Sequence, residues 1–582
     1  MQKLIIMKSS KSLLKDKLPK VLLIFVFVLV PNIHYAQNNY YVSTTGDDTN
    51  SGSFSSPWRT IQHGVNQLMP GDTLNIKAGT YEEKIEINVS GTPNAYITIK
   101  NYNNDNVVLD AINFSNSDAI IWTDRSYLRI IGLHLTNNIK NYATGFEIQG
   151  SAHDIEFINN KISNIRFSSQ QNPTVTPSKN AVPLNIWGDN ATDSIHNILI
   201  KGNEIFNNMT GYSENLTGGG NFTNFIFEDN IIHDNTNIGI DVTGHYGVCP
   251  NPALDQGRNG IIRNNIVYNC RAYYSTAAGI YVDGGKNIII ENNTSYQNGY
   301  GIEIGCEEDG TTDRVIVRNN LIYNNHDAGI AIGGYDSNTT GNVTNTKVYG
   351  NTFYKNDTED NYNGEILLTQ LDNCHITSNI FYPTNQSVLL EASRNQSNFE
   401  FNYNLIYQDN GTENIVVETP AGSYNTLSDY YNASGQGMQN IFGNPLFVAP
   451  LQGDFHIQSQ SPAIDNGNPN LTIDPNEVDL DGQIRIDNNI IDCGVDEYYN
   501  NNGVKTTQNV SIKIYPNPAY NQIFIDNNIQ NFSYKIFTLE GKKIAQGEAV
   551  DKILLFNISP GIYILKLTTE SNNTFTKKIL IK

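Results

Sequence analysis

Four short strand-like phrases align with one another, and three of them carry acidic residues. The phrases are "GIDVTG", "GIYVDGG", "GIEIGCE" and "GIAIGG". Strand side chains alternate between two faces, so Asp241, Tyr281 and Glu303 form one outward column. Asp283 lies in the neighbouring column. Carboxyl groups on successive repeats can act as a general acid and a general base on one bond.

The spacing of these acids indicates the kind of bond. If repeats stack at about 4.8 Å, the backbones of Asp241 and Glu303 lie about 9.6 Å apart, and that of Asp283 lies about 8 Å from each. Carboxyl groups of inverting glycosidases lie roughly 6.5 to 9.5 Å apart. Close carboxylates on a partly dry face also raise one another's pKa, which suits a general acid. We therefore expect an endo-acting glycoside hydrolase with Asp283 as acid and Asp241 or Glu303 as base.

The long insert "GHYGVCPNPALDQGRNG" follows Asp241 directly, and inserts on repeat proteins often build the binding face. His245 in this insert is a further candidate catalytic residue. Aromatic rings suit the C–H faces of sugar rings, and charged groups at strand ends could bind hydroxyl groups. The candidate substrate-binding residues are Trp187, Tyr246, Tyr273, Tyr274, Tyr281, Tyr300, Arg258, Lys286 and Glu307.

Two other functions fit the same residues. A polysaccharide lyase would use His245 or Lys286 as base, and Arg258 or calcium to neutralise a uronate carboxylate. No compact Lys/Arg pair is evident on one strip, which favours hydrolysis. A non-catalytic glycan-binding surface protein would use the same aromatic face.

A repeated phrase fixes the architecture that must position these residues. Its shared asparagine recurs at a basic period near 27 residues, with short alternating strands on either side. Such a unit cannot close its own core, but stacked units pair every strand with the next rung, which predicts a parallel β-helix. An Asn at one position per rung can hydrogen-bond to the rungs above and below it. The repeated residues are Asn203, Asn230, Asn265, Asn293, Asn320, Asn351 and Asn379.

The passage "NYYVSTTGDDTNSGSFSSPWRTIQHGVNQLMPGDTLNIKAGTYEEKIEI" contains a predicted helix at 60–68, expected to cover the first rung. This passage and the repeats after it resemble secreted right-handed parallel β-helix proteins, many of them polysaccharide lyases or glycoside hydrolases. The resemblance covers residues 39 to 499 and implies an all-β right-handed solenoid over 37–439 with a closing segment over 440–499. Asp479 and Asp481 in that segment could hold calcium, although a structural turn is the preferred interpretation.

Both ends of the chain are predicted to be export signals. Six lysines precede an apolar run over 21–30, which predicts a signal peptide over 1–36. No other stretch is long enough to span a membrane. After a linker at 500–510, residues 511–582 predict a small β-sandwich. Their phrases "IKIYPNPAYNQIFI" and "ISPGIYILKL" resemble the type IX sorting domain of Bacteroidota, which implies that secretion machinery as a partner and a secreted or surface-attached protein.

Charge and cysteine content narrow the partners. The 582 residues carry a formal charge of −21, which opposes binding to nucleic acid. The two terminal segments are basic, so residues 37–510 alone carry −30. The expected partner is an extracellular polysaccharide, with algal glycans such as sulfated fucans and pectin both open, but an anionic glycan would need local cations or calcium. Cys249 and Cys270 could pair across the insert, and no spacing matches a zinc site.

Overall fold

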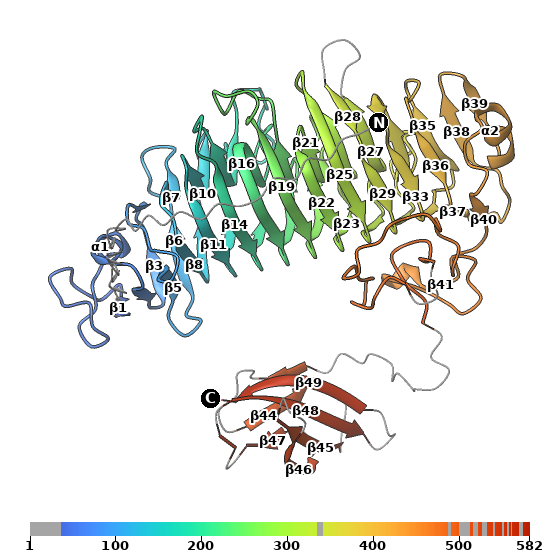
Figure 1. Ribbon diagram of the computed structural model, residues 1–582. Coiled ribbons are helices and arrows are strands. Elements are labelled where there is room, and N and C mark those ends of the chain that lie inside the picture. The colour runs from blue at the N-terminus through green and yellow to red at the C-terminus, as the bar shows by residue number, and fades with distance from the viewer. Residues whose placement is uncertain are drawn as a thin grey trace, which may run out of the picture. The chain divides into compact units, whose positions relative to one another are not determined.

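The computed structural model describes residues 37–334, 341–486 and 490–499, and the strands of the C-terminal segment between 513 and 581. The predicted signal peptide and the predicted linker lie outside the described residues. The chain divides into two compact units, residues 1–455 with 461–496 and residues 456–460 with 497–582. The first unit is a stack of short parallel strands, as predicted (Figure 1).

Each turn of the stack contributes strands to three faces. Face 1 is built from β4 (Ile85–Ile87), β7 (Ala119–Thr123), β10 (Ala143–Gln149), β13 (Ala181–Gly188), the first half of β16 (Leu216–Glu228), β18 (Ile240–Thr243), β21 (Ala278–Asp283), β24 (Tyr300–Cys306), β27 (Ala328–Gly334), β31 (Ile366–Leu368), β35 (Val388–Ala392) and β38 (Val416–Thr419).

Face 2 follows face 1 along the chain. It is built from β1 (Asn39–Val42), β2 (Thr73–Ile76), β5 (Ile97–Asn101), β8 (Leu128–Ile131), β11 (His153–Ile158), β14 (Ile195–Lys201), the second half of β16, β19 (Gln256–Arg263), β22 (Lys286–Glu291), β25 (Thr311–Arg318), β28 (Asn342–Thr344), β29 (Lys347–Tyr349), β32 (Leu371–Asp372), β33 (His375–Thr377) and β36 (Glu400–Asn402).

Face 3 completes each turn. It is built from β3 (Gly79–Tyr81), β6 (Val107–Asp110), β9 (Leu133–Thr136), β12 (Lys161–Ser163), β15 (Glu204–Phe206), β17 (Ile231–Thr236), β20 (Ile266–Arg271), β23 (Thr294–Tyr296), β26 (Leu321–Tyr323), β30 (Thr352–Tyr354), β34 (Ile380–Tyr382), β37 (Leu405–Ile406) and β40 (Ile441–Phe442).

The core is a set of aligned apolar columns. On face 1, Ile240 pairs in register with Ile280, which pairs with Ile302. All three side chains are fully buried. Because the columns repeat at every rung, the same face presents the intervening side chains outward at fixed spacing. This is how the fold positions the acids.

The predicted asparagine ladder is confirmed. The backbone N–H and the Nδ2 of Asn265 both donate to Oδ1 of Asn293, each at 2.9 Å. Asn293 in turn donates to Oδ1 of Asn320 through the same two groups. These amides are buried, so the ladder satisfies polar groups that would otherwise destabilise each turn.

Helices lie near both ends of the stack (Figure 1). The predicted N-terminal helix is present as α1 (Ile61–Gln67), with Thr60 as its N-cap residue. At the other end, β38 pairs antiparallel with β39 (Gly422–Tyr424), and α2 (Leu427–Ser434) follows. The sequence pattern did not predict α2, because it lies outside the repeated phrase.

The closing segment contains β41 (Phe447–Ala449), the short 3-10 helix η1 (Pro450–Gln452) and β42 (Asp454–Ile457). Asp479 Oδ1 accepts hydrogen bonds from the backbone N–H groups of Asp481 at 2.9 Å and Gln483 at 2.8 Å. These are the bonds of a tight turn, which was the preferred interpretation of the aspartates.

The C-terminal strands form two antiparallel sheets. One contains β43 (Lys513–Tyr515), β44 (Gln522–Asp526) and β47 (Lys552–Leu554), and the other contains β45 (Phe532–Phe537), β46 (Lys543–Ala549), β48 (Gly561–Thr569) and β49 (Thr574–Ile581). Ile523 from the first sheet and Ile536 from the second belong to one apolar cluster.

Candidate active site

A cavity of about 920 Å³ opens on face 1 at the rungs that carry the predicted acids. Five carboxylates line it, and we call it the acid cavity. No lysine, arginine or histidine is among the described residues that line it. The five acids are Glu214, Asp241, Asp283, Glu303 and Glu307.

The strand register confirms the predicted columns. Asp241 pairs with Tyr281, and Tyr281 pairs with Glu303. Asp283 occupies the neighbouring column. Glu214, which the sequence analysis missed, lies two residues before Leu216, the partner of Ile240. That alignment was the only signal for Glu214, because its segment "GYSENL" lacks the repeated phrase.

Burial and mutual repulsion raise the pKa values of these acids. Asp241 is 2% exposed, and its Oδ1 has no hydrogen-bond partner. Burial first, and then the neighbouring Glu214 and Asp283, hold the pKa of Asp241 well above its usual range. Burial also raises the pKa values of Glu214 and Asp283 to about 7. The group therefore retains protons near neutral pH.

The other two acids contact the cavity from β24 and the loop after it. Burial, followed by the charges of Glu307 and Asp283, raises the pKa of Glu303 well above its usual range. Burial likewise raises the pKa of Glu307. The side chain of Glu303 is half-buried and that of Glu307 is exposed, and both line the cavity.

Asp283 is held by two donors. The hydroxyl of Tyr246, in the long insert, donates to Asp283 Oδ2 at 2.5 Å. The backbone N–H of Glu307 donates to Asp283 Oδ1 at 2.8 Å. Both bonds stabilise the charged form of Asp283, so they lower its pKa against the larger effect of burial. The insert therefore folds toward the acids and orients one of them.

Comparison with known proteins identifies the fold family. Residues 40–373 match the model of the Pel9A-like right-handed β-helix region. The chain belongs to the Pel9A-like family. It is 32% identical to the uncharacterized protein YwoF of Bacillus subtilis over 474 residues, which cover 78% of this chain and 97% of YwoF. Pectate lyase PEL9 of Emericella nidulans is 27% identical over 146 residues, covering 19% of this chain and 36% of that protein.

Solved structures of similar shape include lyases and a hydrolase. Pectate lyase Pel9A has a TM-score of 0.41 and 16% identity, covering 80% of this chain and 97% of that chain. The lacto-N-biosidase of Eubacterium ramulus has a TM-score of 0.40 and 14% identity, covering 70% and 68%. The family match shows a right-handed β-helix of the Pel9A-like type, and 146 residues of the chain are similar to a pectate lyase.

The C-terminal residues 513–582 match the secretion-system C-terminal sorting domain. The Pel9A-like protein is therefore secreted or attached to the cell surface, and the type IX machinery is its export partner. Within the described part of the chain, every helix is too short or too polar to cross a membrane.

The structure brings most predicted site residues of this Pel9A-like chain together. Besides the acids, five of the six aromatic residues expected at the site line the acid cavity, and Trp187 remains 42% exposed. These cavity-lining residues are Trp187, Tyr246, Tyr274, Tyr281 and Tyr300.

Four predicted residues lie elsewhere. His245 does not line the cavity, because its Nε2 faces the Gln256 side-chain amide at 3.1 Å and the backbone N–H of Thr311 at 3.3 Å. Tyr273 points away and donates to the Pro173 carbonyl at 2.6 Å. Both side chains hold loops in place.

Arg258 and Lys286 belong to face 2, where they pair in register. The chain turns the corner between faces near Gly284, whose φ of 84° is a left-handed conformation. Arg258 donates to Asn221 Oδ1 in β16 at 2.8 Å and to the Leu254 carbonyl in the insert at 2.5 Å, and so anchors the insert. These two cations, predicted to bind substrate beside the acids, do not line the acid cavity, because residues after the corner face a different direction.

The proposed cysteine pair is also absent. Cys249 and Cys270 are free thiols, as are the other three cysteines. Cys270 lies inside β20 on face 3, where burial raises the pKa of its thiol to about 12. Cys249 lies in the insert, with its Sγ 3.4 Å from the Asn190 carbonyl oxygen. The two cysteines therefore lie in different parts of the turn, one on face 3 and the other in the insert.

Gly305 makes room for an aromatic wall of the site. A Cβ at this position would lie 2.6 Å from the Tyr281 hydroxyl oxygen. Only glycine therefore allows the Tyr281 side chain to extend over the next rung. The same side chain contributes to lowering the pKa of Glu307 against the larger effect of burial.

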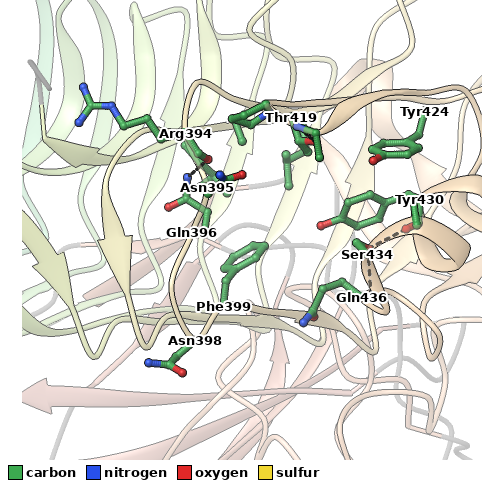
Figure 2. Close-up of a pocket in the computed structure, with 16 residues that line it drawn as sticks. Arg394, Asn395, Gln396, Asn398, Phe399, Thr419, Tyr424, Tyr430, Ser434 and Gln436 are labelled. Carbon is green, nitrogen blue, oxygen red and sulfur yellow. Dashed lines mark hydrogen bonds between the residues drawn. The ribbon is translucent and has the colours of Figure 1, made fainter.

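A second cavity, of about 340 Å³, lies near the C-terminal end of the stack. We call it the terminal cavity. In Figure 2, Tyr424 and Tyr430 lie across it from Arg394 and Gln396. Its lining contains amides, hydroxyl groups and aromatic rings, but no aspartate, glutamate or histidine among the described residues.

Proposed function

We propose that the protein is a secreted glycoside hydrolase whose reaction takes place in the acid cavity. The observation that carries this proposal is a set of five carboxyl groups with raised pKa values and no neighbouring cation. Such a set supplies a protonated acid and an ionised base at one pH, which glycoside hydrolysis requires.

The hydrogen bonds favour Asp283 as the base and Asp241 as the acid, the reverse of the order expected from sequence. Asp283 accepts two donated bonds, which stabilise its ionised form. Asp241 has an oxygen without any donor and four acidic neighbours, so its protonated form is favoured. In this assignment Asp241 donates its proton to the glycosidic oxygen. Asp283 removes a proton from the water that attacks the anomeric carbon.

The separation of the two residues favours inversion. One rung along the stack and two residues along the strand place their backbones about 8 Å apart. That distance leaves space for a water molecule beside the sugar, as in inverting enzymes. We therefore expect the product to carry the opposite anomeric configuration from the substrate.

The lining favours an uncharged glycan. Trp187, Tyr274 and Tyr300 offer ring faces on which sugars stack. A sulfate or uronate group would meet several carboxylates and no cation, and the charge repulsion inside the cavity is poorly screened. A neutral polysaccharide is therefore the expected substrate, ahead of sulfated fucan or pectin.

A polysaccharide lyase is the second candidate. The match to pectate lyase PEL9 favours it, and carboxylate oxygens are the ligands that calcium prefers. However, no three carboxylates of the described acid cavity bring ligand atoms within 4.8 Å of one another. The phenols of Tyr246 and Tyr281 have pKa values raised by burial and nearby acids, which makes them poor bases.

The purified protein should be incubated with neutral and anionic polysaccharides, with reducing ends and ultraviolet absorbance recorded together. We expect new reducing ends from a neutral glycan, no absorbance of a conjugated double bond, and no loss of activity with chelator. Proton NMR of the first products should show inversion. Unsaturated products would establish the lyase, and tight binding without cleavage of any glycan would establish a binding protein.

A further inference from the structure

Three side chains on face 2 form a cluster unrelated to the acid cavity. His153 and Asp154 begin β11, and His196 occupies the position on β14 that pairs with His153. One ligand atom from each side chain lies within 4.8 Å of the other two. All three are half-buried, so solvent and ions reach them.

The two imidazole rings are already aligned. Their centroids lie 4.8 Å apart with planes inclined by 12°. His196 Nδ1 lies 2.9 Å from the Ser194 carbonyl oxygen. A carbonyl only accepts, so Nδ1 carries the proton and Nε2 keeps a lone pair, which is the arrangement of a metal-binding histidine.

Asp154 is also oriented. Its φ of 55° is left-handed, a conformation that Asp adopts more readily than most residues. The Tyr96 hydroxyl and the Asn197 amide each donate to its Oδ1 at 3.3 Å. Its Oδ2 faces His153 Nδ1 at 2.7 Å. The two donors hold Oδ1 in place, and Oδ2 keeps a further lone pair beside His153 for an ion.

A groove of about 440 Å³ adjoins Asp154. Tyr96, Glu156 and Asn197 contribute to its walls. The groove gives water or a small ligand access to the cluster, so an ion bound there would not be fully enclosed.

We propose that His153, Asp154 and His196 bind one divalent transition-metal ion of the zinc class, with a coordination position open toward the groove. Two imidazoles and a carboxylate select zinc and its neighbours over calcium or magnesium. Tetrahedral ligands at about 2.0 to 2.1 Å from zinc lie about 3.4 Å apart, so the rings must tilt inward. They stand on the outer surface and can tilt without disturbing the core.

The test uses the full mature chain without a polyhistidine tag. Calorimetric titration with Zn²⁺ should give one ion per chain, and Cu²⁺ bound in its place should show two nitrogen ligands by electron paramagnetic resonance. His153→Gln and His196→Gln should each weaken Zn²⁺ binding by about 100-fold or more, since each removes a ligand. Asp154→Asn keeps the left-handed backbone and should weaken binding by at least about 10-fold.

His375→Gln is the matched control. His375 also lies on face 2 beside a carboxylate, with its Nδ1 2.6 Å from Glu400 Oε2, but it belongs to no three-ligand cluster among the described residues. Its variant should bind Zn²⁺ as the native chain does. Circular dichroism should show that every variant is folded. Absence of Zn²⁺ binding by the native chain, or binding as tight as the native chain's by both cluster histidine variants, would overturn the proposal.

Discussion

The two cavities of the β-helix differ in what surrounds their polar groups. The acid cavity gathers five carboxyl groups, and Asp241 Oδ1 lacks any hydrogen-bond partner. The terminal cavity has no aspartate or glutamate among its described lining residues: Ser434 Oγ donates to the Tyr430 carbonyl at 2.6 Å, and the one buried oxygen there without a partner, Gln396 Oε1, belongs to a neutral amide. Both cavities have aromatic walls. Aromatic walls therefore do not distinguish a reactive site, whereas poorly satisfied acids do.

The difference has a structural origin. The acid cavity lies in the regular stack, where the strand register places one column of carboxyl groups beside another. The terminal cavity lies where the stack stops, between β38, β39 and α2. Its polar groups lie at the end of α2 and in the β38–β39 hairpin. We expect the first cavity to carry the chemistry and the second to carry stability.

The largest effect should come from Asp283→Asn. Losing the base should lower kcat for the best glycan by about 1,000-fold or more, at the upper part of the range for general acid–base groups. Tyr424→Phe in the terminal cavity is the matched control and should leave kcat within about twofold. Initial rates from reducing-end release measure both. Full activity in the Asp283 variant would remove the acid cavity as the reactive site.

Asp241→Asn should lower kcat on a natural glycan by about 100-fold or more, because the leaving oxygen then lacks a proton donor. An aryl glycoside with an acidic phenol leaves without protonation, so the variant should cleave it at nearly the native rate. Comparing the two substrates in the native and variant chains measures this selective rescue. Equal losses on both substrates would contradict the role of acid.

The sequence predicted the columns of acids, but it did not predict the directions of side chains beyond the corners between faces. Asp241, Asp283 and Glu303 could be placed because a strand alternates with a period of two and the repeats align without gaps. Arg258 and Lys286 were misplaced because the direction of a side chain changes at a corner, and the left-handed turn at Gly284 is a backbone property. Glu214 and α2 lie in segments without the repeated phrase, so the aligned phrases did not include them.

The acid cavity should also make stability depend on pH. Burial raises the pKa of Asp283 from 3.8 to about 7, so the folded state favours its protonated form. Its contribution is complete below about pH 4 and disappears as the pH rises through about 7, a change of about 4 kcal/mol for a shift of this size.

The free energy of unfolding of the β-helix should therefore fall between pH 4 and pH 8, as measured by denaturant titration. Asp283→Asn removes one of the five carboxyl groups with raised pKa values and should make this fall smaller, giving a variant that is more stable than the native chain at pH 8. Tyr424→Phe should retain the native slope. An unchanged slope in the Asp283 variant would show that this carboxyl is not the group that titrates.

The smallest effect should come from Gly305→Ala. The added Cβ would meet the Tyr281 hydroxyl at 2.6 Å, so the phenol must move away from its place over the rung. The acids remain, so kcat should fall only several-fold, while KM rises because an aromatic wall has shifted. Gly435→Ala is a useful contrast beside the terminal cavity, since its Cβ meets nothing within 4 Å but its φ of 73° is left-handed. Gly435→Ala should lower the melting temperature without changing KM, because it strains the backbone away from the acid cavity. Gly305→Ala should instead raise KM, so the two variants distinguish a shifted binding wall from a strained backbone.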